Sequence, residues 1–170
     1  RTAYKGSRSA TEIRGCMSVI TNVYTALKAK SVTTTSGKTP TVYGLNELPE
    51  NITTSQLPCR LLLPVGGTPG EGRDLSFIAI GTGLTVNWQI TDLMLWQASE
   101  QGIGLREFAP EIVDYAGKYV DMLRTFRCPY ANTALESASV TPGEYEWPRG
   151  SGRFYAGVLC QLNIKEVVSG

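Results

Sequence analysis

The stretch FYAGVLCQLNIKEV, residues 154–167, has the clearest alternation in the sequence. Its polar members Gln161, Asn163 and Lys165 alternate with apolar ones, and the apolar positions are Phe154, Ala156, Val158, Cys160, Leu162 and Ile164. Successive side chains of a β-strand point to opposite faces of a sheet. The alternation therefore predicts a half-buried antiparallel strand of about ten residues.

Further strands are predicted upstream of this one. Apolar residues alternate over 57–63, a segment bracketed by Pro58 and Pro64, and again over 73–80 and 84–96. In the last of these the apolar phase slips near Asp92, which indicates either a bulge there or burial of both faces. Short strands are expected at 41–43 and 135–140, whereas TPGEYEWPRGSGR, residues 141–153, is typical of a turn-rich hairpin tip.

Two amphipathic helices are also predicted. Ser9 and Glu12 have capping-box spacing at the start of the first helix, which ends near Lys28 and Lys30. The second helix is expected to have Pro110 in its first turn, where the missing N–H is not needed, and to end at Cys128-Pro129. Its apolar face comprises Ile112, Tyr115, Ala116, Tyr119, Met122, Leu123 and Phe126.

The order of these elements predicts an α+β fold, in which two amphipathic helices pack on an antiparallel sheet. The chain has 170 residues, of which 42% are hydrophobic, so one domain can bury a substantial core. Residues 1–8 are polar and basic without periodicity. We therefore expect a flexible N-terminal arm at 1–8 and a single domain over 9–170.

Composition limits the chemistry. Histidine is absent, which excludes Ser-His-Asp and Cys-His catalysis and histidine-ligated metals. Sixteen Lys and Arg balance fifteen Asp and Glu, so the chain has no general attraction to nucleic acid or to an anionic membrane. No apolar run is long enough to span a membrane. The four cysteines lack the close spacing of a metal site, and buried free thiols are the favoured interpretation over a disulfide.

No motif points to catalysis or to a cofactor. The glycine-rich stretch 66–72 lacks the Lys-Ser or Lys-Thr of a phosphate-binding loop, and Gly81-Thr82-Gly83 is only half of a dinucleotide fingerprint. Asp114 and Asp121 lie on one helix face with Lys118 between them, which favours a solvated face with weak ion pairs. The aromatic and basic residues of 145–155 favour packing or protein contact over stacking on nucleic acid or a sugar. We therefore predict no catalytic, cofactor-binding or metal-ligating residue.

The ordered set of segments resembles the tail-terminator and tail-completion proteins of long-tailed bacteriophages. The resemblance comprises the N-terminal helix, LPCRLLLP (57–64), VNWQITDLMLWQASEQG (86–102), FAPEIVDYAGKYVDMLRTF (108–126) and the terminal FYAGVLCQLNIKEV. It covers about residues 11–168 and is one of layout, without a short diagnostic motif.

This resemblance implies a non-enzymatic virion protein of the tail or neck, assembled in the host cytoplasm. It implies a homohexameric ring that caps the tail tube, contacts the tail-tube and head–tail connector proteins, and lets DNA pass as cargo. Ring contacts require two different patches per subunit. Exposure and flexibility suggest the interface candidates Thr34, Lys38, Gly67, Thr68, Glu71, Glu144, Trp147 and Arg149. The alternatives are another neck or tail-tube subunit, or an unrelated binding module or enzyme.

Overall fold

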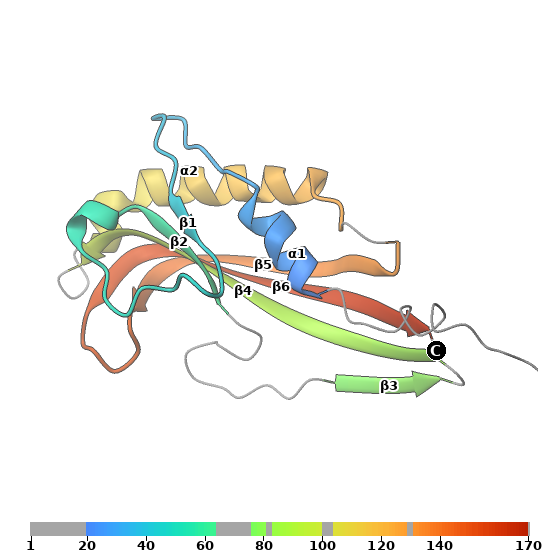
Figure 1. Ribbon diagram of the computed structural model, residues 1–170. Coiled ribbons are helices and arrows are strands. Elements are labelled where there is room, and N and C mark those ends of the chain that lie inside the picture. The colour runs from blue at the N-terminus through green and yellow to red at the C-terminus, as the bar shows by residue number, and fades with distance from the viewer. Residues whose placement is uncertain (1–19, 64–75, 81–82, 100–103, 129–130, 170) are drawn as a thin grey trace, which may run out of the picture.

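The computed structural model describes residues 20–63, 76–80, 83–99, 104–128 and 131–169. Two α-helices, one short 3-10 helix (Thr54–Gln56) and six strands occupy these ranges (Figure 1). In chain order the helices and strands are α1 Ile20–Lys28, β1 Thr41–Tyr43, β2 Cys59–Leu63, β3 Ser76–Ile80, β4 Gly83–Ser99, α2 Gly104–Thr125, β5 Thr133–Glu146 and β6 Phe154–Ser169.

The strands form one sheet in the order β1-β2-β4-β6-β5, with β3 also paired to β4. All pairs are antiparallel except β1 with β2. The predicted last strand is β6, which lies between β4 and β5 and pairs with β4 from Phe154 to Ser169. The predicted α+β class is confirmed.

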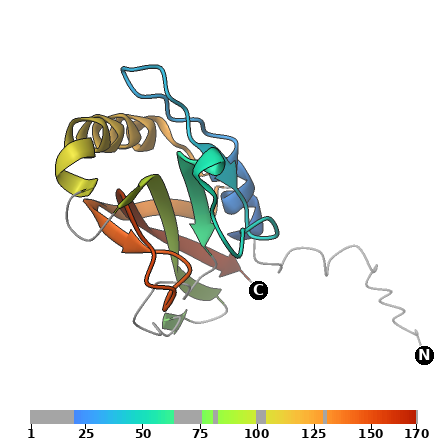
Figure 2. The same ribbon diagram turned by 90° about the vertical axis from the view of Figure 1, so that its left-hand side faces the viewer.

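Both helices cover the same face of the sheet (Figure 2). Helix α2 packs on β4, β5 and β6, whereas Tyr24 of α1 donates a hydrogen bond to the carbonyl of Leu63 at the end of β2. The even-numbered apolar residues of β4 from Trp88 to Trp96 and of β6 from Ala156 to Ile164 face the helices, in keeping with the predicted alternation. This core includes Val23, Leu27, Leu62, Ile90, Met94, Trp96, Ile112, Tyr115, Tyr119, Val158, Cys160, Leu162 and Ile164.

Among the described residues, the chain between β1 and β2 and the tip between β5 and β6 cover one end of the other face of the sheet. A second cluster forms there from Ile52, Cys59, Leu61, Leu63, Leu93, Leu95 and Tyr155. Strand β2 is therefore buried on both faces, as is β4 from Ile90 to Trp96. Burial of both faces explains the slip near Asp92.

The bulge in β4 lies at Trp96 rather than near Asp92. The pairing of β4 with β6 shifts between Leu95 and Gln97, opposite Gly157. A side chain at Gly157 would run into the carbonyl oxygen of Met94. The bulge therefore brings the two backbones so close that glycine is required on β6.

Three predicted boundaries are wrong. Strand β6 has 16 residues rather than about ten. Helix α2 begins at Gly104, so Pro110 lies inside the helix rather than in its first turn. A longer helix is tolerated because its apolar face continues through Phe108 into the core. Strand β5 continues to Glu146, so 141–146 is strand and the hairpin tip is 147–153. Pro142 is accepted there because β5 is an edge strand. The predicted arm at 1–8 and the helix start at Ser9 lie outside the described residues.

Candidate functional site

Residues 31–40, which we call the finger, connect α1 to β1 and rise beyond α2 (Figure 1). They form an ordered turn rather than an irregular loop. The amide of Thr34 donates to the carbonyl of Lys38 at 3.0 Å, and the amide of Gly37 donates to the carbonyl of Thr34 at 2.9 Å. Gly37 has φ +82°, a conformation that glycine adopts without strain. These hydrogen bonds, both within residues 31–40, form the turn of the finger.

The finger is attached to α2 through Asp114. One carboxylate oxygen accepts a hydrogen bond from the amide of Thr35 and the other from its hydroxyl, both at 2.7 Å. The bond from the Thr35 amide first, and then the bond from its hydroxyl, lower the pKa of Asp114. Burial opposes them, and the charge of Lys118 adds a smaller lowering. Beside this contact, Lys38 Nζ lies 5.2 Å from the centre of the Trp96 ring, a cation–π distance.

A buried charge pair holds the base of the finger. Arg60 Nε donates to both oxygens of Asp92, at 2.9 and 2.7 Å. The same guanidinium donates to the carbonyls of Leu27 and Lys30, where α1 ends and the finger begins. The Leu27 carbonyl also accepts the amide of Lys30 at 3.1 Å, so Arg60 adds a second donor at the C-terminus of α1. Tyr119 of α2 donates to Asp92 at 2.7 Å and connects the second helix to the pair.

Burial and the charges of this pair shift the pKa of Arg60 and of several neighbouring side chains. Burial alone would lower the pKa of the Arg60 guanidinium, but the adjacent Asp92 carboxylate raises it overall. Burial, followed by the charge of Asp92, raises the pKa of Tyr115, Tyr119 and Cys160. Among the described residues the hydroxyl of Tyr115 has no hydrogen-bond partner. All three of these groups are therefore neutral at physiological pH, and Arg60–Asp92 is the charged centre of the core.

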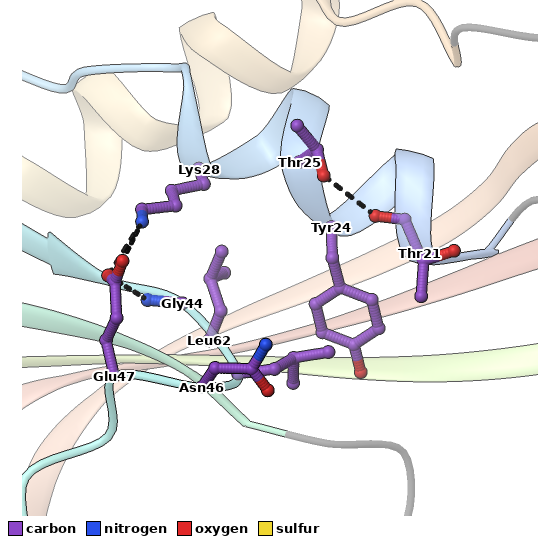
Figure 3. Close-up of a pocket in the computed structure, with 9 residues that line it drawn as sticks. Thr21, Tyr24, Thr25, Lys28, Gly44, Asn46, Glu47 and Leu62 are labelled. Carbon is purple, nitrogen blue, oxygen red and sulfur yellow. Dashed lines mark hydrogen bonds and ion pairs between the residues drawn. The ribbon is translucent and has the colours of Figure 1, made fainter.

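A hollow of about 300 Å³ lies between α1 and the chain after β1 (Figure 3). Helix α1 contributes Thr21, Tyr24, Thr25 and Lys28, which share one face of the helix. Lys28 Nζ lies 2.7 Å from both carboxylate oxygens of Glu47, and the Gly44 amide also donates to this carboxylate. The Lys28 hydrogen bond is the main cause of the lowered pKa of Glu47. The charged groups here satisfy one another and fasten the loop to α1.

The tip at 147–153 packs on its own domain. Trp147 Nε1 donates to the carbonyl of Pro49 at 3.2 Å, which fixes the indole on the chain between β1 and β2. The Glu146 carboxylate accepts the amide of Gly152 at 2.6 Å, and backbone bonds to Gly152 and Gly150 lower its pKa. The predicted packing of this tip is thus confirmed for Trp147.

The candidate interface residues lie in separate places. Thr34 and Lys38 belong to the finger, but Thr34 is only 4% exposed and serves the turn, whereas Lys38 is exposed. Glu144 accepts a hydrogen bond from Ser99 and is half-buried. Arg149 is exposed at the tip. Gly67, Thr68 and Glu71 lie outside the described residues.

Sequence reasoning missed two features. Asp114 was expected on a solvated face, and it instead holds the finger. Arg60 and Asp92 were treated as strand positions only. Each is a charged residue inside an apolar run, CRLLL and ITDLML respectively. Where two such runs are neighbouring strands, opposite charges at these positions indicate a buried pair.

The chain matches no protein family, no curated protein and no solved structure. Within the described ranges no three Cys, Asp or Glu side chains are grouped to hold a metal ion. Neither described helix is long and apolar enough to cross a membrane.

Proposed function

We propose that this chain is a structural subunit that assembles with copies of itself into a ring, as the tail-terminator proteins of long-tailed bacteriophages do. The main support for this proposal is the finger. It is held at its base by Arg60, along its length by Thr34, and at its turn by Asp114. Its exposed residues include Ser36 and Lys38, which are accessible to another molecule.

A closed ring needs two different patches on each subunit. The finger is one, and the tip at 147–153 is a second that differs from it in shape and composition. The tip is fixed by Trp147 and Glu146, and it exposes Arg149, Gly150, Ser151, Gly152 and Arg153. Two rigid, unlike surfaces support head-to-tail assembly. In the virion such a ring would cap the tail tube and contact the head connector.

The test is the mass of the protein in solution at two concentrations, measured by light scattering after size exclusion, with electron microscopy of the same sample. We expect rings of six subunits with an open centre. A monomer at the highest concentration would contradict the proposal, and filaments of indefinite length would favour a tail-tube subunit.

A matched pair of variants tests the role of the finger. Asp114→Ala removes both bonds to Thr35. Asp121→Ala also removes a carboxylate from α2, but that carboxylate makes only a 3.8 Å ion pair with Arg124. We expect the first variant to weaken ring assembly at least tenfold and the second to assemble like the wild type. Equal assembly of the two variants would show that the finger is not part of the interface.

A further inference from the structure

A shallow notch lies between the turn of the finger and the first half of α2. Its volume is about 500 Å³, and the residues that line it are Thr35, Ser36, Pro110, Glu111 and Asp114. The two carboxylate oxygens of Asp114 are engaged by the amide and the hydroxyl of Thr35. Glu111 therefore supplies the carboxylate of the notch that is open to another group.

The Glu111 carboxylate has no cation of its own. It is half-buried, and within the described part of the chain it forms no hydrogen bond or ion pair. Two cations of the finger and α2 act elsewhere: Lys38 lies over the ring of Trp96, and the charge of Lys118 acts on Asp114. A carboxylate that is partly withdrawn from water gains from a cation supplied by another molecule.

A second copy of the chain can supply that cation from one place. Among the described residues, the Lys and Arg side chains that form no hydrogen bond or ion pair are Lys30, Lys38, Arg106, Lys118 and Arg149. The first four lie on α2, on the finger or beside its base, which is the side of the molecule that carries the notch. Arg149 lies on the tip and is exposed.

The tip and the notch lie on opposite sides of the subunit (Figure 1, Figure 2). Trp147 anchors the tip in the cluster on the face of the sheet away from the helices, whereas the notch lies on α2. The tip is a tight turn, closed by the bond from the Ser151 amide to the Pro148 carbonyl at 3.1 Å, and it projects Arg149. A contact from tip to notch thus joins two different patches, as a ring requires.

We propose that the tip of one copy docks in the notch of the next, with the Arg149 guanidinium against the Glu111 carboxylate. This inference rests on the proposed ring and names the contact that closes it. A planar guanidinium can give a carboxylate two parallel hydrogen bonds, which fix the angle between the two groups. The bonds of Asp114 to Thr35 hold the wall of the notch in place.

Charge reversal tests this contact, with the mass in solution as the readout. Glu111→Arg gives notch and tip the same sign, and so does Arg149→Glu. Like charges brought together at an interface oppose binding strongly. At the concentration at which the wild type assembles, we expect each single variant to have the mass of one copy. Asp121→Arg changes the net charge as much as Glu111→Arg does, and it should assemble like the wild type.

Mixing the two single variants tests whether the contact joins different copies. The reversed notch of one variant then meets the reversed tip of the other, and the unchanged notch meets the unchanged tip. We therefore expect the equimolar mixture to recover the mass of the wild-type assembly. The double variant, which carries both reversals, should also assemble, and circular dichroism should show that all variants fold. Assembly of either single variant by itself, or failure of both the mixture and the double variant, would overturn the contact.

These outcomes separate the contact from the ring. A wild-type ring whose single variants also form rings supports the ring and overturns the contact. Wild-type filaments that respond to the charge reversals as described support the contact and overturn the ring. A wild-type monomer overturns both.

Discussion

Arg60 Nη2 lies 2.6 Å from Asp92 Oδ2, and each of these side chains is only 1% exposed. The pair connects β2 to β4, and through its other bonds reaches both helices. Tyr119 donates a further hydrogen bond to Asp92, and Arg60 donates to the carbonyls of Leu27 in α1 and of Lys30 just beyond it. Removal of one partner leaves the other charge buried, which is among the larger penalties a core can incur.

Arg60→Met should therefore lower the free energy of unfolding by about 3–5 kcal/mol. Asp92→Leu should lower it similarly, because it leaves the guanidinium buried without its carboxylate. Chemical denaturation monitored by tryptophan fluorescence measures both.

The double variant, which carries both Arg60→Met and Asp92→Leu, tests whether the two charges stabilise each other. The effects of substituting two residues in contact do not add. We expect the double variant to lose about 2 kcal/mol less free energy of unfolding than the sum of the two single losses. Strict additivity would mean that the two charges do not stabilise each other.

Gly157→Ala should destabilise the protein by about 1–3 kcal/mol, because the added methyl meets the backbone carbonyl of Met94, which cannot rotate away. The matched control is Gly117→Ala. Gly117 is exposed in the middle of α2, with open space where its Cβ would lie. There alanine should raise stability by about 0.8–1 kcal/mol through helix propensity. Thermal unfolding of the two variants should move in opposite directions.

The finger should loosen in acid. In the folded protein the pKa of Asp114 lies below its ordinary value. The bonds to Thr35 therefore stabilise the folded finger fully at any pH above the ordinary pKa. This stabilisation is lost as the pH falls through the lower pKa of the folded state. We expect the amide resonance of Thr35 to shift below about pH 4. Nuclear magnetic resonance follows this titration. Asp114→Asn should abolish it, and an unchanged titration in that variant would assign the transition to another group.

The described cysteines should differ in reactivity. Cys59, Cys128 and Cys160 are free thiols. Burial raises the pKa of Cys59 to about 12 and that of Cys160 well above its ordinary value, whereas Cys128 is only partly covered. A thiol reagent at pH 8, followed by mass spectrometry, should label Cys128 before the other two. Labelling of Cys59 or Cys160 at the same rate in the folded protein would contradict their burial.

Local patterns in the sequence predicted much of the fold. The alternation of 154–164 and the helical spacing of 112–126 predicted β6 and the buried face of α2, because both patterns reflect burial of one face. Pattern alone could not place Pro110 or Pro142. Proline is tolerated inside α2 because packing of Phe108 and Ile112 outweighs one lost bond, and in β5 because the residue lies at an edge.

The candidate site was less predictable, because its contacts join distant parts of the chain. Thr35 and Asp114 are 79 residues apart, and Arg60 and Asp92 are 32 apart. Nothing within either segment identifies its partner. The finger shows the same limit, because SVTTTSGKTP gives no sign of the two bonds that join it to Asp114 of α2.

The central position of β6 has a consequence for biosynthesis. It follows every other strand of the described ranges, yet it separates β4 from β5 and supplies the partner residues of both. While the ribosome is still making β6, the strands on either side of it have emerged and lack their neighbour. The sheet therefore closes late, by contacts between residues far apart in sequence, which is the slow class of folding step. During this interval β4, which is apolar on both faces from Leu93 to Trp96, is exposed to other nascent chains, and a chaperone that holds it is expected to raise the yield.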